Sequence, residues 1–183
     1  MSKISAIVTL SATAFAFVAT VASAAGTMAL PARRTGYWEI TVTIDKTKAI
    51  SPLVMHACLD TASDKAMMAA AMSVKMGMCK QSDIEHLGDS YVWDSTCNEG
   101  AMKIASHVIV SGDFQSSYSM VTTGEISVGG KEPEKMASLQ IGKWLSDACA
   151  NGMVSGDLDM GAAGRININN IVKGMAGKAA PSE

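Results

Sequence analysis

The sequence lacks an excess of basic charge. It contains 15 Lys and Arg residues against 17 Asp and Glu residues, for a formal net charge of −2. No cluster of basic residues interrupts this even distribution. Nucleic acid and anionic membrane surfaces are therefore not expected as partners, because both are bound through concentrated positive charge.

Recognisable catalytic and cofactor motifs are also missing. There is no Gly-x-Ser-x-Gly elbow, no His-Glu-x-x-His pair and no Gly-rich loop before a Lys-Ser/Thr pair. The four cysteines form no Cys-x-x-Cys pair, so they lack the spacing of thioredoxin-like and zinc-ribbon sites. We therefore expect a non-catalytic domain with no cofactor, and an enzyme whose catalytic residues come from distant positions is a further alternative.

Long apolar runs are absent except at the N-terminus. Lys3 precedes an uncharged apolar stretch from Ile4 to Ala22, which ends in the small-x-small sequence Ala22-Ser23-Ala24. This pattern predicts a signal peptide over residues 1–24 that is cleaved before Ala25, and hence a periplasmic or secreted protein. A retained anchor is the alternative, but the richness in Ala, Ser and Thr and the cleavage site favour removal, and no later segment is apolar enough to span a membrane.

Export gives the four cysteines an oxidising compartment, in which structural disulfides are the expected outcome. Three pairings are open. Cys79 and Cys97 bracket one predicted hairpin, which favours their pairing and leaves Cys58 for Cys149. A two-residue turn at Gly88-Asp89 would set Cys97 opposite Lys80, however, so this pairing needs a bulge or a longer turn.

The spacing of apolar side chains changes along the rest of the chain, and this change predicts where strands and helices lie. Apolar and polar residues alternate from Tyr37 to Ile44, which predicts a half-buried strand, and Leu53 to Cys58 predicts a second. Thr61 to Met78 is rich in helix formers, with Thr61 and Asp64 spaced as a capping box. Strands are then predicted at 82–87, 90–96, 102–110, 114–122, 125–128 and 135–145.

This order predicts an α+β fold that is mainly antiparallel β. We expect a curled sheet or barrel-like meander with one helix inserted after the second strand. Residues 25–35 are expected to be a flexible leader, 36–149 a disulfide-stapled β domain, and 150–183 a Gly-rich tail. Helical spacing in the tail indicates a short closing helix, at Ile168, Ile171, Val172 and Met175.

An ordered set of short motifs lies between residues 33 and 149: an Arg-x-Gly-x-Trp-Glu strand, a Cys-Leu pair, a Trp shortly before a cysteine, a Gly-Asp-Phe turn and a Gly-Lys-x-Leu…Asp…Cys segment. In this set the chain resembles the family of small secreted bacterial proteins catalogued as domain of unknown function 3617. The resemblance implies export, a β-rich fold and two disulfides, and it implies no activity. The residues that carry it are Arg34, Gly36, Trp38, Glu39, Cys58, Leu59, Cys79, Trp93, Cys97, Gly112, Asp113, Phe114, Tyr118, Gly142, Lys143, Trp144, Leu145, Asp147 and Cys149.

The few aromatic residues suggest the first candidate site. If the sheet curls, some of them could line a cavity for an apolar ligand, although packing in the core is the favoured account of most of them. We therefore expect a small apolar ligand or an envelope protein as the partner of a binding or interaction module. The candidate pocket residues are Trp38, Trp93, Phe114 and Trp144.

Methionine suggests the alternative. Of the 14 methionines, Met68, Met72 and Met76 lie four residues apart on the predicted helix. Thioethers are soft ligands that select Cu(I), but the same spacing is what a helix needs to bury one face on a sheet, and we favour that structural role. The histidines, at His56, His86 and His107, fit no ligand spacing and predict separate surface residues.

Overall fold

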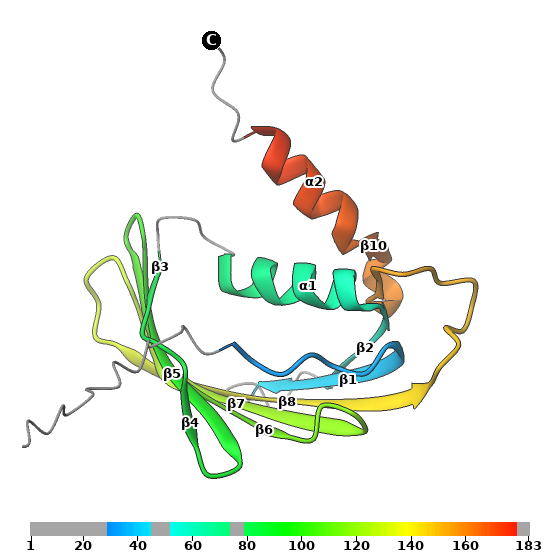
Figure 1. Cartoon of the computed structure of the whole chain (residues 1–183). Helices are drawn as coiled ribbons and strands as arrows, with labels where there is room; N and C mark the ends of the chain where they lie inside the picture. The colour runs from blue at the N-terminus through cyan, green and yellow to red at the C-terminus, as the bar shows by residue number, and fades with distance from the viewer. Residues whose placement is uncertain (1–28, 45–51, 74–78, 179–183) are drawn as a thin grey trace, which may run out of the picture.

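The computed structural model describes residues 29–44, 52–73 and 79–178, with the side chains of 69–73 and 175–178 left out (Figure 1). The predicted signal peptide, residues 45–51 and Met76 lie outside these residues. The elements, in chain order, are β1 (Gly36–Ile44), β2 (Leu53–Leu59), α1 (Thr61–Ser73), β3 (Cys79–Gln81), β4 (Glu85–Leu87), β5 (Ser90–Glu99), β6 (Met102–Gly112), β7 (Ser117–Val128), β8 (Glu134–Ser146), β9 (Asp157–Asp159), a 3₁₀ turn (Gly161–Ala163), β10 (Arg165–Asn167) and α2 (Ile168–Lys178).

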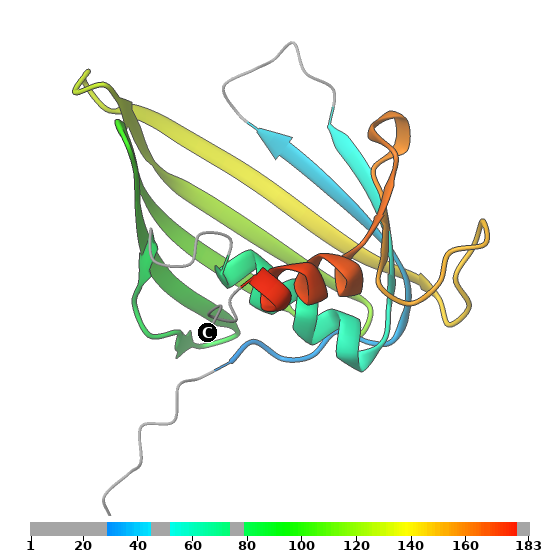
Figure 2. The same cartoon turned by 90° about the horizontal axis from the view of Figure 1, so that it is seen from above.

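All the strands belong to one antiparallel sheet, in the order β10-β9-β2-β1-β8-β7-β6-β5-β3, with β4 also paired to β5. The sheet curls without joining its two end strands, so it is an open, curved sheet and not a closed barrel. Helix α1 lies across the concave side, and α2 lies beyond α1 (Figures 1 and 2). The predicted fold class is confirmed, including the helix after β2 and the short helix in the tail.

The alternation predicted for β1 places its two faces in different surroundings. Trp38 and Ile40 point to the concave side and join the main core cluster, in which Trp38 is completely buried. Tyr37 points to the convex side, where it packs with Cys58 and Met153 under the segment that follows β8. The core is therefore concentrated on the concave side, as expected for a sheet that curls around one set of apolar side chains.

Both disulfides are present: Cys58 bonds to Cys149 and Cys79 bonds to Cys97. The second pair requires a change of register, because the register of β4 with β5 would set Lys80 opposite Cys97. Residues 82–84 contain one residue more than the facing residues 93–94, and this bulge brings Cys79 opposite Cys97. The strand predicted over 82–87 is therefore shorter than expected: β4 covers only Glu85–Leu87, residues 82–84 form the bulge, and β3 precedes the predicted range.

The predicted strand at 114–122 begins too early. Phe114 has a φ of 58° and lies in a turn, and β7 then runs unbroken from Ser117 to Val128. The Asp113 carboxylate organises this turn by accepting hydrogen bonds from the backbone N–H groups of Gln115, Ser116 and Ser117. A hydrogen bond from the Ser116 hydroxyl, followed by these backbone contacts, holds the pKa of Asp113 well below its usual range.

The capping box of α1 is shifted by one residue from the prediction. Asp60 Oδ1 accepts the backbone N–H of Ser63 at 2.7 Å, and Ser63 Oγ accepts that of Asp60 at 2.8 Å. Asp60 is thus the N-cap in place of Thr61. Asp64 is buried and takes part in a different contact, described below.

The tail after Cys149 adds more structure than a closing helix. Strand β9 pairs with β2 and β10, which extends the sheet beyond β2. The Asp157 carboxylate joins this region by accepting hydrogen bonds from the Val154 backbone N–H and the Asn167 side chain. Strands of three residues are too short to show a period, so the sequence did not reveal them.

Candidate functional site

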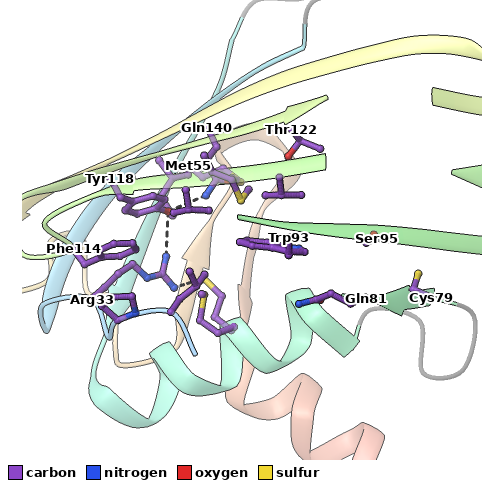
Figure 3. A pocket seen from close by; sticks show the side chains of 18 of the residues that line it. Arg33, Met55, Cys79, Gln81, Trp93, Ser95, Phe114, Tyr118, Thr122 and Gln140 are labelled. Atoms are coloured by element: carbon purple, nitrogen blue, oxygen red, sulfur yellow. Dashed lines mark hydrogen bonds between the residues drawn. The ribbon is translucent and has the colours of Figure 1, made fainter. Parts of the chain in front are cut away.

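A cavity of about 450 Å³ lies between the concave face of the sheet and α1 (Figure 3). Its two ends differ. At the deep end, Arg33, Phe114 and Tyr118 are each more than nine-tenths buried. At the mouth, on the opposite side in Figure 3, Gln81 is exposed and Ser95 is half-buried.

The walls of the cavity are mostly apolar. Strand β6 contributes Val108 and Val110, β1 contributes Ile40, and β5 contributes Trp93. These residues occupy alternate positions of their strands, because only every second side chain of a strand faces the concave side. Among the described side chains, four methionines also line it, namely Met55 on β2, Met67 and Met68 on α1, and Met120 on β7.

A buried polar cluster closes the deep end. Arg33 Nε donates to Asp64 Oδ1 at 2.6 Å, and the Arg33 backbone N–H donates to Asp64 Oδ2 at 3.1 Å. Arg33 Nη1 donates to the Tyr118 hydroxyl at 3.2 Å, and Gln140 Nε2 donates to the same hydroxyl at 2.9 Å. The cluster joins the segment before β1 to α1, β7 and β8, so one contact network fixes one end of the cavity.

The position of Tyr118 depends on a glycine in the neighbouring strand. Gly142 lies opposite Tyr118 in the register of β7 and β8, and a Cβ atom at position 142 would overlap the Tyr118 ring. The ring therefore lies flat over β8. It also packs against Trp38, with ring centroids 5.8 Å apart, and against Phe114, with centroids 6.1 Å apart.

The four aromatic residues of the candidate pocket are found in three different settings. Trp93 and Phe114 line the cavity. Trp38 is in the core behind Tyr118, where its Nε1 donates to the Arg34 carbonyl at 2.8 Å. Trp144 packs at the edge of the core, and the Arg34 guanidinium carbon lies 3.7 Å from its ring centroid.

Of the methionine series, Met68 lines the cavity, while the side chain of Met72 and all of Met76 lie outside the described residues. The structure keeps the histidines apart. His56 stacks on Tyr37, His86 stacks on Tyr91, and His107 contacts Asp94 at 2.8 Å. Among the described residues, no three His, Cys, Asp or Glu side chains are grouped as metal ligands.

Reasoning from the sequence missed the polar cluster. Arg33 falls within the predicted flexible leader, yet it is only 8% exposed. One signal was available. Gln140 and Gly142 are two residues apart on β8, so both face the concave side. A polar amide on that face, among apolar side chains of other strands, indicates a specific hydrogen-bond partner. Arg33 has no such signal, because it precedes the first periodic segment.

Comparison with known proteins gives one result. The model of a family described as a protein of unknown function, DUF3617, matches residues 33–149. No curated protein and no solved structure matches the chain. The matched range begins at Arg33 and ends at Cys149, so it includes the polar cluster and both disulfides. Within the described residues, no helix is both long enough and apolar enough to cross a bilayer.

Proposed function

The chain belongs to the DUF3617 family, whose function is unknown, and we propose from its own geometry that it is a non-catalytic binding protein that holds a small apolar ligand between the curled sheet and α1. The observation that carries the proposal is the cavity itself. Its volume of about 450 Å³ falls within the range of roughly 300–1,000 Å³ typical of ligand sites. Such sites combine apolar walls with a few polar groups that fix orientation, which is the composition found here.

The methionines support a ligand whose shape is not rigid. A methionine side chain is unbranched and polarizable, so it adapts to irregular apolar surfaces. Met67 and Met68 on α1 face Met55 and Met120 on the sheet across the same cavity. A lining of this kind suits a flexible chain better than a rigid planar molecule.

Export into an oxidising compartment is part of the proposal. Two disulfides and no free cysteine among the described residues are compatible with a protein outside the cytoplasm. N-terminal sequencing of exported protein is expected to begin at or near Ala25. A mature protein that begins at Met1 would contradict cleavage.

Probe binding tests the cavity directly. N-phenyl-1-naphthylamine, which fluoresces more strongly in apolar surroundings, is expected to bind the wild-type protein. Thr122 lines the cavity, whereas the next residue, Thr123, is exposed on the convex face. Thr122→Trp should therefore fill the cavity and weaken probe binding by at least about tenfold, an effect equal to ~1.4 kcal/mol.

The matched control is Thr123→Trp, which adds the same side chain to the same strand and should leave probe binding unchanged. Thermal unfolding of both variants checks that they are folded. Equal binding by the wild type and Thr122→Trp, or no binding by the wild type, would rule out the cavity as a ligand site.

Cu(I) binding is the second candidate, because four thioethers line the same cavity. One contact opposes Cu(I) binding. Arg33 Nη2 lies 3.2 Å from Met67 Sδ, so the positively charged guanidinium already lies beside a sulfur that would have to bind the metal ion. We expect no tight Cu(I) binding in a titration. Tight binding that is lost in Met68→Leu, with an unchanged melting temperature, would favour the metal over the apolar ligand.

A further inference from the structure

We infer that the cavity selects a neutral amphiphile, whose carbonyl oxygen is bound at the deep end by Tyr118 and Arg33 while its apolar chain extends toward the mouth. The inference rests on the proposed function, since it names the chemical class of ligand for the same cavity. It follows from two properties of the buried cluster: the hydrogen-bond donors that have no acceptor, and the balance of charge.

The Tyr118 hydroxyl has an uncommitted proton. A phenolic oxygen can accept hydrogen bonds through its lone pairs and donate one through its proton. Here it accepts from both Arg33 and Gln140, and among the described residues it donates to none. The residue is 6% exposed and lines the cavity, so its proton is withheld from bulk water.

Arg33 contributes further donors. A guanidinium has five N–H bonds. Three are directed to Asp64, the Tyr118 hydroxyl and the weak acceptor Met67 Sδ, so two have no acceptor among the described residues. A buried donor without an acceptor is unfavourable. A ligand that brings an acceptor to this end would remove that cost.

The charge of Arg33 is already compensated. Asp64 lies 2.6 Å from its Nε, and both side chains are almost fully buried. Among the residues that the structure describes, no other residue that lines the cavity carries a charge. A ligand carboxylate would therefore add a net negative charge to an apolar enclosure, which is strongly unfavourable.

The groups that remain available on Tyr118 and Arg33 are all donors, and this favours a head group that accepts hydrogen bonds. An ester, amide or ketone carbonyl accepts hydrogen bonds and has no proton that needs a partner on that oxygen. An alcohol would also bring a proton of its own, which neither Arg33 nor the Tyr118 oxygen, already accepting two hydrogen bonds, can accept. The apolar chain can then follow Trp93, which lies between the deep end and the mouth, and Val108, which also lines the cavity.

Competition against N-phenyl-1-naphthylamine tests the inference with three ligands that share one chain: dodecane, methyl dodecanoate and dodecanoate at pH 7.5. We expect the ester to bind at least about tenfold more tightly than either of the others, the equivalent of roughly one hydrogen bond to a charged or buried group. Equal binding of the ester and dodecane, or tighter binding of dodecanoate, would overturn the inference while leaving the apolar cavity intact. Failure of all three ligands and of the probe would instead overturn the proposed function.

Two variants assign the preference to the named groups. Tyr118→Phe keeps the ring but removes the hydroxyl, and should abolish the advantage of the ester over dodecane. The matched control, Tyr91→Phe, alters a tyrosine that packs edge-on against Phe114 outside the cavity lining, and should retain the advantage. An ester preference that survives Tyr118→Phe would overturn the inference.

Asp64→Asn leaves the charge of Arg33 uncompensated, so dodecanoate should gain at least about tenfold in affinity and overtake the ester. No gain by dodecanoate in a folded Asp64→Asn protein would contradict the charge argument. If this variant does not fold, the comparison of wild type, Tyr118→Phe and Tyr91→Phe decides the question alone.

Discussion

The two ends of the sheet are built differently. At the closed end, β1, β2 and β8 surround the fully buried Trp38, and the segment after β8 covers the convex side through Cys58–Cys149. At the open end, β3 and β4 have three residues each, and Cys79–Cys97 lies at the mouth of the cavity. We therefore expect the closed end to provide most of the stability of the fold and the open end to provide access to its interior.

The largest expected effect concerns the two disulfides. Their partners are separated by 91 and 18 residues, so in the chain-entropy model they stabilise the fold by about 4.5 and about 3 kcal/mol. Replacing Cys58 and Cys149 by Ala should therefore lower the free energy of unfolding more than replacing Cys79 and Cys97, as measured by urea denaturation. The reverse order would show that the open end carries the stability.

The tryptophans offer a comparison within the core. Trp38→Ala removes a completely buried side chain, and we expect a loss of about 3–5 kcal/mol in the free energy of unfolding. Trp93→Ala removes a half-buried cavity wall and should cost about 1–2 kcal/mol. Probe affinity should show the opposite ranking when it is measured on the folded proteins, with Trp93→Ala the more damaging.

Gly142→Ala tests the close approach of β8 to the Tyr118 ring. The added Cβ would overlap the ring, so either the ring or the strand must move. Overpacking of this kind costs about 1–3 kcal/mol, and here it should also displace the Tyr118 hydroxyl and weaken binding of methyl dodecanoate. Gly174→Ala is the control, because that helical position has open space and Ala is the better helix former.

The smallest effect concerns acid stability at the start of α1. Hydrogen bonds from the hydroxyl of Ser155, and then from Ser63, lower the pKa of Asp60 from 3.8 to about 2. A carboxylate with a lowered folded-state pKa stabilises the fold above its unfolded value and loses that contribution as the pH falls. Stability that depends on Asp60 should therefore decrease between about pH 4 and pH 2. Asp60→Asn keeps an N-cap residue but cannot titrate, so its urea midpoint should change less over this interval.

The sequence predicted those elements of the fold whose residue pattern continues over several positions. Alternation located β1, strand-forming segments between turn residues located β2 and the long strands, and a run of helix formers located α1, because each of these signals extends over several residues. The hairpin bulge and the three-residue strands of the tail have no such length. The turn that holds Phe114 depends on the Asp113 carboxylate. This carboxylate accepts hydrogen bonds from the backbone N–H groups of the turn, in place of hydrogen bonds to a neighbouring strand.

The candidate site was less predictable than the fold for a related reason. Trp93 and Phe114 were named as pocket residues because they are aromatic, which is a property of the residue type. The contact of Arg33 with Asp64 joins residues 31 positions apart, on either side of two strands, and depends on how α1 crosses the sheet. Nothing local in the sequence encodes that crossing.

The disulfide between Cys58 and Cys149 also makes the chain a covalent ring that contains α1 and the strands from β3 to β8. A protease that cuts once within this ring, for example at the exposed Gly129-Gly130 turn, would leave two fragments that are still bonded to each other. The nicked molecule would keep its mass on a non-reducing gel and retain both walls of its cavity in one covalent unit. A single cut in the backbone of this segment therefore does not by itself separate the two walls of the cavity.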